Sequence, residues 1–217
     1  MIIPVKVQRM RPLNALSLAF FLIAFYFAVS LFFPIHEVWI YESLFFLIPA
    51  LFFLKFKPVL FDSKFFIKKT TLTELLLVAT LAIGISFFLD LVLNYWNHLL
   101  PLPQSYQNYY EQILVAPHWR DEIYLYFSLG LFPAICEEYF FRGFLQNTLA
   151  KSWSNKTAIA VTAALFALCH LNPWYFPFYL ILGYFLGWCQ SYRNNILHPI
   201  LAHLINNLIA ITAFKVL

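Results

Sequence analysis

The sequence predicts an all-α membrane protein, a polytopic bundle of about seven transmembrane helices. Two observations indicate this fold class. Hydrophobic residues make up 62% of the 217 residues and charged residues only 11%, whereas soluble domains contain about 25% charged residues. Apolar segments also recur along the chain, and the mean hydropathy is +0.74. The composition therefore excludes an ordinary soluble domain and indicates an integral membrane protein.

Seven apolar segments account for the predicted bundle. A helix needs about 20 mostly apolar residues to cross a bilayer, and six of the segments meet or approach this length. The fifth is short for a full span and could be tilted or partly buried. No internal repeat is evident, so we expect one continuous membrane domain. The segments are Leu13–Phe33, Val38–Leu54, Leu72–Trp96, Ile123–Leu149, Thr157–Leu171, Trp174–Tyr192 and Ile196–Phe214.

The basic residues predict how these segments are oriented. If the N-terminus is inside and the chain crosses seven times, eleven of the fourteen Lys and Arg residues face the cytoplasm. The positive-inside rule requires such a bias. Arg120 and Lys215 then lie outside, and Arg142 lies within a span. The net charge of +4 follows from this topology and does not indicate a nucleic-acid partner. The cytoplasmic residues are Lys6, Arg9, Arg11, Lys55, Lys57, Lys64, Lys68, Lys69, Lys151, Lys156 and Arg193.

The longest predicted outer loop, 98–121, is rich in proline and aromatic residues. Aromatic side chains of this kind prefer the headgroup layer of the membrane. The loop could be an interfacial helix and a lid over a site that opens outward, or it could be a plain connector. Its proline and aromatic residues include Pro101, Pro103, Tyr106, Tyr109, Tyr110 and Trp119.

Three charged residues lie within the fourth apolar segment. Charged side chains cost about 3 kcal/mol or more at membrane depth, so they usually mark a functional site and have named partners. Glu138 and Arg142 are four residues apart with the acid first, which favours an ion pair on one helical face. Glu137 is rotated by about 100° from Glu138 on an ideal helix and need not share that pair. The alternative is a structural cluster in which both acids share Arg142.

Two later segments carry polar residues at helical spacing. Phe166 and His170 are one turn apart, although a lone histidine on an apolar helix is more often a hydrogen-bonded core residue than a catalyst. His203 and Asn207 are also four residues apart, so they project to the same side of their helix. Asn206 points elsewhere, and we expect it to bond a neighbouring helix.

Together these residues resemble the motifs of the CAAX-protease and bacteriocin-processing (CPBP, or Abi) family of intramembrane proteases. The three motifs occur in the family's order, each in an apolar segment, and the resemblance extends over residues 122–213. The residues before it match only as generic membrane helices. The matching runs are Glu137-Glu138-Tyr-Phe-Phe-Arg142 for EExxxR, Phe166-Ala-Leu-Cys-His170 for FxxxH and His203-Leu-Ile-Asn-Asn207 for HxxxN.

The resemblance implies hydrolysis of peptide bonds in the membrane by a catalytic helical core at 122–217. Glu137 would be the general base that takes a proton from water. His170 would hold and polarise that water. His203 and Asn207 would stabilise the oxyanion of the tetrahedral intermediate.

The same resemblance assigns supporting roles to the remaining motif residues. Glu138 and Arg142 would brace the helix and orient the site, and Arg142 could also touch substrate. Phe166 would pack beside His170. Residues 1–121 would supply the N-terminal membrane helices and the outer loop.

A metal is possible but is not favoured by the residues. Glutamate and two histidines can bind zinc, and the ligands would then be Glu137, His170 and His203. The sequence has no HExxH pair, however, and an amide such as that of Asn207 is a poor zinc ligand. A glutamate-activated water without a cofactor explains all four residues more simply.

The expected substrate is a hydrophobic, lipidated or membrane-anchored peptide or protein in the lipid bilayer. Eukaryotic relatives in the family trim the three residues after a prenylated cysteine, but this chain is compact and resembles the prokaryotic members. We therefore expect a location in a prokaryotic plasma membrane.

Two other functional classes stay open. One is a non-catalytic membrane immunity or scaffold protein that keeps the fold without the activity. The other is a proton-coupled transporter, because proton relays also use intramembrane Glu, His and Arg. The ionisable residues crowd into the C-terminal half, and the N-terminal half offers mainly Glu42, Glu74 and Asp90. This asymmetry argues against a transporter built from repeats.

Overall fold

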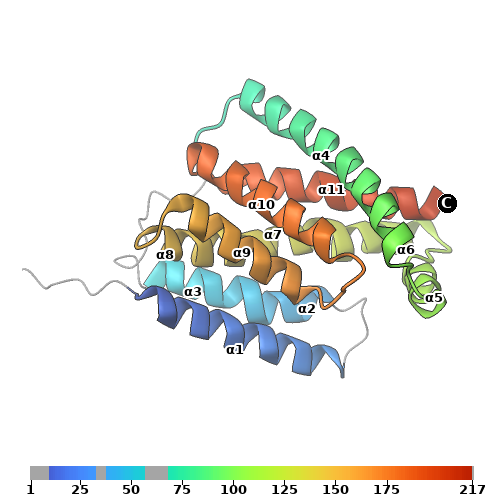
Figure 1. Cartoon of the computed structure of the whole chain (residues 1–217), viewed down its shortest axis with the longest axis horizontal. Coiled ribbons are helices and arrows are strands. Elements are labelled where there is room, and N and C mark those ends of the chain that lie inside the picture. Colours follow the sequence, from blue (N-terminus) through green and yellow to red (C-terminus); the bar gives the residue numbers. More distant parts are fainter. Residues whose placement is uncertain (1–9, 33–37, 57–67, 217) are drawn as a thin grey trace, which may run out of the picture.

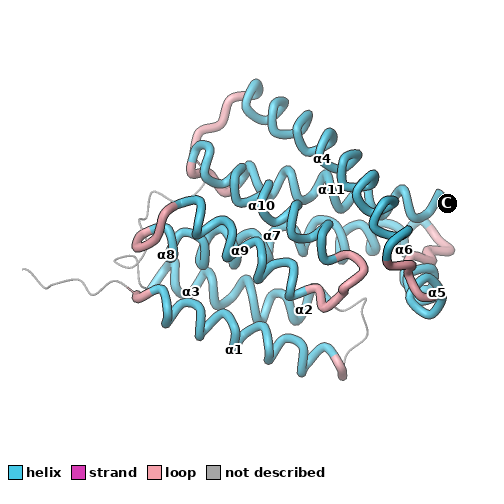
Figure 2. The backbone as a smooth tube through the Cα atoms, in the orientation of Figure 1, coloured by secondary structure: helices cyan, strands magenta, loops and turns pink. Residues whose placement is uncertain are grey.

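The computed structural model describes residues 10–32, 38–56 and 68–216 (Figure 1). These residues form helices and connecting loops without a strand (Figure 2), which confirms the predicted all-α class. The elements are α1 (Pro12–Ser30), α2 (Val38–Glu42), the π-helical η2 (Ser43–Leu47), α3 (Ile48–Phe56), α4 (Leu72–Leu99), α5 (Gln104–Ile113), α6 (Trp119–Leu125), the π-helical η4 (Tyr126–Leu131), α7 (Phe132–Glu138), the π-helical η5 (Tyr139–Gln146), α8 (Asn147–Ala150), α9 (Asn155–Cys169), α10 (Phe176–Arg193) and α11 (Leu197–Val216).

Helices occupy all seven predicted segments, with ends that differ from the prediction by a few residues. Elements α2, η2 and α3 follow one another without a break and form the second helix (38–56). Elements α6 to α8 likewise form the central helix (119–150). Among the described residues, α1 and α4 are the two helices long and apolar enough to cross a membrane by themselves. The count of seven spans therefore stays a prediction.

Local sequence explains where several of these helices begin and end. Thr71 caps α4 with a capping box, in which its hydroxyl accepts from the Glu74 amide at 3.2 Å and the Glu74 carboxylate accepts from the Thr71 amide at 3.1 Å. Ser154 caps α9 by accepting from the Thr157 amide at 3.1 Å. α10 ends at Asn194, whose φ of 51° is one that asparagine tolerates. Of these three helices, α9 carries a motif, and α4 and α10 pack beside the helices that carry the others.

The central helix runs through the middle of the bundle (Figure 1). On one side it contacts α1 and the second helix, and on the other it contacts α9, α10 and α11. α4 packs outside this layer, against α10 and α11. Protein therefore surrounds the predicted charged cluster.

Aromatic side chains join the second helix to the central helix. The rings of Phe46 and Phe140 lie 5.0 Å apart between centroids, and those of Phe53 and Phe144 lie 5.1 Å apart. Phe46, Phe140 and Phe144 are almost completely buried. Aromatic pairs at these distances stabilise a packed interface beyond the area that they bury. These contacts fix the second helix along the η5 part of the central helix.

Candidate active site

The two neighbouring glutamates lie where the central helix changes from α-helical to π-helical. Glu137 and Glu138 end α7, and the π-helical η5 follows directly. Both side chains are buried. π-helical segments are rare and frequently occur at functional sites. The change of helical pitch therefore coincides with the charged residues that the sequence singled out.

Glu138 is the centre of a buried hydrogen-bonded cluster. Its Oε1 atom accepts from Arg142 Nη1 at 2.7 Å, which confirms the predicted ion pair. The same oxygen lies 2.8 Å from Nδ1 of His203, on α11. Both members of the Glu138–Arg142 pair are shielded from solvent. Glu138 thus links two of the three motifs, a connection that the sequence did not predict.

Arg142 also ties the central helix to α10. Its Nη2 donates to the carbonyl oxygen of Gly183 at 2.9 Å. Its guanidinium carbon lies 4.6 Å from the centre of the Phe166 ring, in the range of a cation–π contact. A Cβ atom at Gly183 would lie 3.1 Å from the Cα of Ala163, so glycine permits the close approach of α9 to α10. Arg142 is therefore a structural brace with three kinds of partner.

His170 is the last residue of the FxxxH motif, and its ring bonds a backbone group of the helix that precedes it. Its Nδ1 lies 2.8 Å from the Phe166 carbonyl oxygen, which can only accept, so Nδ1 carries the proton. In a neutral ring Nε2 then has the free lone pair. The His170 ring also stacks on the Tyr179 ring with a centroid distance of 3.6 Å. Sequence reasoning missed Tyr179, because its contact with His170 depends on how α9 and α10 pack.

Phe166 lies between the two histidines. Its ring centroid is 4.9 Å from that of His170 and 5.7 Å from that of His203. It also meets Phe141 edge to face at 5.4 Å. The expected packing beside His170 is present, and the ring spaces the two imidazoles.

The two asparagines of α11 have different partners. Asn207 Nδ2 donates to the carbonyl oxygen of Gly130, in η4, at 3.2 Å. The side-chain amide of asparagine has two N–H bonds, so this contact uses one of them. Asn206 instead accepts from Ser86 Oγ of α4 at 3.1 Å, which confirms the expected bond to a neighbouring helix.

Glu137 does not share Arg142, and its partner comes from the N-terminal half of the chain. The carboxyl groups of Glu137 and Glu42 lie within hydrogen-bonding reach of each other. Sequence reasoning placed Glu42 among the ionisable residues of the N-terminal half but not in the site. The available signal was a single acid in an otherwise apolar segment, 38–54.

Comparison with known proteins agrees with the motif resemblance. Residues 119–209 match the family described as type II CAAX prenyl endopeptidase Rce1-like. This segment of the chain is similar to that family. The match supports a CAAX-type protease and an integral membrane protein at the level of the family, and it covers less than half of the chain.

A curated relative matches over a similar length. The UPF0177 protein YxdF of Lactococcus lactis subsp. lactis (strain IL1403) is 33% identical over 92 residues, which are 42% of this chain and 50% of that protein. The alignment therefore spans half of the length of this relative. No solved structure matches the chain.

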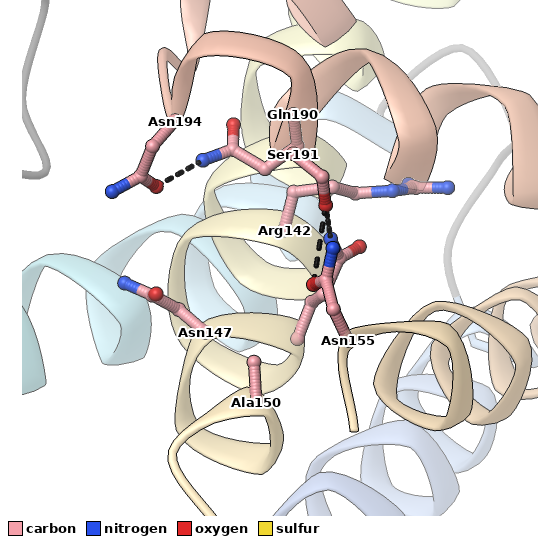
Figure 3. Close-up of a pocket in the computed structure, with 8 residues that line it drawn as sticks. Arg142, Asn147, Ala150, Asn155, Gln190, Ser191 and Asn194 are labelled. Carbon is pink, nitrogen blue, oxygen red and sulfur yellow. Dashed lines mark hydrogen bonds between the residues drawn. The ribbon is translucent and has the colours of Figure 1, made fainter. Parts of the chain in front are cut away.

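A polar pocket of about 200 Å³ lies beside Arg142, at the α8 end of the central helix (Figure 3). Across it, Ser191 donates to Asn155 at 3.3 Å, and Gln190 donates to Asn194 at 3.2 Å. None of the predicted catalytic residues lines this pocket, so the pocket is separate from the candidate active site. Its lining consists of Arg142, Gln146, Asn147, Ala150, Asn155, Gln190, Ser191 and Asn194.

The three residues named for a possible metal do not fit a metal centre. Within the described ranges, no three His, Cys, Asp or Glu side chains are grouped to hold an ion. Nδ1 of His203 contacts Glu138 and Nδ1 of His170 contacts the Phe166 carbonyl, so Nε2 is the available nitrogen of each ring. A zinc centre needs at least three such ligands around one point, and Glu137 and the histidines do not provide it. The expectation of a glutamate-activated water without a cofactor stays a prediction.

The predicted outer loop contains helix α5, which contacts the loop between α9 and α10. Asn172 Nδ2 donates to the Tyr110 hydroxyl at 3.0 Å. The rings of Tyr106 and Trp174 lie 4.7 Å apart. Burial, followed by the nearby Tyr175 phenol, raises the pKa of Tyr110 to about 12, so the hydroxyl keeps its proton at neutral pH. The predicted loop thus contains a helix, as the first of the two alternatives proposed, whereas its role as a lid stays a prediction.

Proposed function

We propose that the chain is an intramembrane endopeptidase in which Glu137 activates water for the hydrolysis of a peptide bond. One observation carries this proposal. Three helices bring the motif residues together. Glu138, next to Glu137, bonds Arg142 of the same central helix and His203 of α11, and Phe166 of α9 lies against both Arg142 and His203. The cluster lies in the Rce1-like segment, which supports a protease of the CAAX type.

In the proposed reaction Glu137 takes a proton as the water oxygen bonds to the carbonyl carbon of the substrate. The carbonyl oxygen becomes an oxyanion. The C–N bond then breaks, and the proton held by Glu137 passes to the leaving amine. The free Nε2 of His170 accepts a hydrogen bond from the attacking water. A positioned general base typically contributes about 10² to 10⁴ in rate.

His203 and Asn207 are proposed to stabilise the oxyanion. Glu138 engages Nδ1 of His203, so Nε2 is the nitrogen that can face the substrate, and it donates when it carries a proton. Asn207 keeps a second N–H after its bond to Gly130. One such donor is worth about 10² to 10³ in rate. In this scheme Glu138 and Arg142 orient His203 and do not exchange protons with the substrate.

The proposed substrates are hydrophobic, lipidated or membrane-anchored peptides and proteins. A site surrounded by apolar helices favours segments that are already in the bilayer.

The first test is a comparison of peptides by mass spectrometry from cells that contain the wild type, Glu137→Ala or Glu74→Gln. Glu74 lies at the far end of α4 in an ion pair with Arg193, so Glu74→Gln is a matched control. Products should appear with the wild type and Glu74→Gln and disappear with Glu137→Ala. Identical products from all three would refute proteolysis by Glu137 and favour a scaffold.

We also propose a prokaryotic plasma membrane with the N-terminus in the cytoplasm. The N-terminal ends of α1, α4 and α9 and the C-terminal end of α10 lie at one end of the bundle (Figure 1). Lys68 Nζ donates to the Arg193 carbonyl at this end, at 3.0 Å. An impermeant maleimide should label Arg120→Cys in intact cells and spare Lys156→Cys, and the reverse pattern would invert the topology. The described basic residues at this end are Arg11, Lys55, Lys68, Lys69, Lys151, Lys156 and Arg193, whereas Lys6, Arg9, Lys57 and Lys64 lie outside the described residues.

A further inference from the structure

The second helix is held against the central helix at two levels. Near the start of the second helix, the rings of Trp39 and Phe132 lie 6.0 Å apart, edge to face. Further along, the Phe46 ring lies 5.0 Å from that of Phe140. Both contacts advance along the two helices in the same direction. The register between the helices is therefore fixed on either side of Glu137.

Glu42 occupies the position between these two contacts. It is three residues after Trp39 and four before Phe46, so all three side chains share one helical face. That face meets α7 at Glu137. The Glu42 side chain is 3% exposed, and its carboxyl group lies within hydrogen-bonding reach of that of Glu137. The packing of two helices, and not a local motif, thus brings these acids together.

The contact between Glu42 and Glu137 requires a proton. An ionised carboxylate can only accept hydrogen bonds, so two carboxyl groups bond to each other only when one of them is protonated. The Oε2 atom of each residue is buried and has no hydrogen-bond partner in the described part of the chain. If Glu137 is the base, it must be ionised, and the proton of the pair then resides on Glu42.

We propose that Glu42 is a positioning residue of the active centre, which donates a hydrogen bond to Glu137 and holds its carboxylate toward the water. This inference rests on the proposed role of Glu137 as general base. Glu42 lies outside the segment that matches the Rce1-like family. The active centre is therefore completed by the N-terminal half of the chain.

Two substitutions separate positioning from mere packing. Glu42→Gln keeps the length of the side chain and an N–H donor, so kcat should stay within about threefold of the wild type, whereas Glu42→Ala should lower kcat by about 10- to 100-fold, the effect of one lost bond to a charged group. KM should stay constant, because Glu42 does not contact substrate. The assay uses the full chain in liposomes with a fluorogenic farnesylated CAAX peptide, and Glu74→Ala is the control. Wild-type kcat in Glu42→Ala, or equal losses in Glu42→Ala and Glu42→Gln, would overturn the proposal.

Infrared spectroscopy of protein with ¹³C-labelled glutamate tests the contact without activity. The wild type should show the carbonyl band of a protonated, hydrogen-bonded carboxyl group, which Glu42→Gln removes and Glu74→Gln retains. A spectrum unchanged by Glu42→Gln would overturn the contact. If the band behaves as expected but no peptide is cleaved by the wild type, the carboxyl pair stands and both the proposed protease function and the catalytic role of Glu42 fail.

Discussion

The central helix and α4 are both long, yet α4 exposes large apolar side chains whereas the central helix buries charged ones. α4 exposes large apolar residues, with Leu76, Phe87 and Leu91 exposed by 59%, 66% and 67%. The central helix is enclosed by its neighbours and buries Glu138 and Arg142 completely. An apolar face can meet lipid directly, whereas buried charges need protein partners. The charged residues of the proposed active site thus lie on the helix that other helices surround. The outer helix α4 covers α10 and α11 with one face and leaves its other face exposed.

The largest effect is expected where the central helix pairs its charges. Arg142→Met leaves the Glu138 carboxylate buried without its cation, and breaking such a pair costs about 3–5 kcal/mol. The free energy of unfolding, measured by denaturant titration in micelles, should fall by this amount. The double variant Glu138→Gln with Arg142→Met leaves no unpaired charge and should recover most of the loss. A single variant as stable as the wild type would contradict the proposed brace.

An intermediate effect is expected for the same Gly→Ala change at two sites, at Gly187 of α10, which faces the central helix, and at Gly84 of α4. At Gly187 a Cβ atom would lie 2.8 Å from Gln146 Oε1 and 2.9 Å from Ile159 Cγ2, so Gly187→Ala should destabilise the protein by about 1–3 kcal/mol. At Gly84 of α4 nothing lies within 4 Å, so Gly84→Ala should stabilise it by about 0.5–1 kcal/mol. Unfolding of the two variants in the same micelles measures the difference. Shifts in the same direction would refute the contrast.

The smallest effect is expected on the exposed face of α4. Leu91→Ala removes a side chain that contacts no packed core, so the free energy of unfolding should change by less than about 0.5 kcal/mol. The cleavage rate in liposomes should stay within about twofold of the wild type. A larger loss of activity would mean that this face of α4 binds a substrate or a second protein.

Local spacing predicted those parts of the site that depend on one helix. The four-residue spacing of Glu138 and Arg142 predicted their ion pair, because neighbours on one helical face are set by the sequence itself. The same rule placed Phe166 beside His170. Hydropathy likewise located the helices to within a few residues.

The contacts between helices could not be read from spacing. His203 reaches Glu138 across 65 residues, and Glu42 reaches Glu137 only because aromatic contacts set the register of two helices. A pattern within one helix does not specify which face meets which neighbour. Nor does the apolar pattern reveal where an α-helix becomes π-helical, as it does after Glu138. Glu137, which helical spacing left without an ion-pair partner, thus lies next to the carboxyl group of Glu42.

The most direct test of the central claim is the cleavage rate of purified Glu137→Gln. The substrate is a peptide identified among the products of the wild type, and circular dichroism first shows that the variant is folded. Glutamine has nearly the same shape as glutamate but cannot take a proton from water. We expect kcat of the Glu137→Gln variant to fall by about 10² to 10⁴ and its KM to change little. Cleavage by the folded Glu137→Gln variant at the wild-type rate would contradict it.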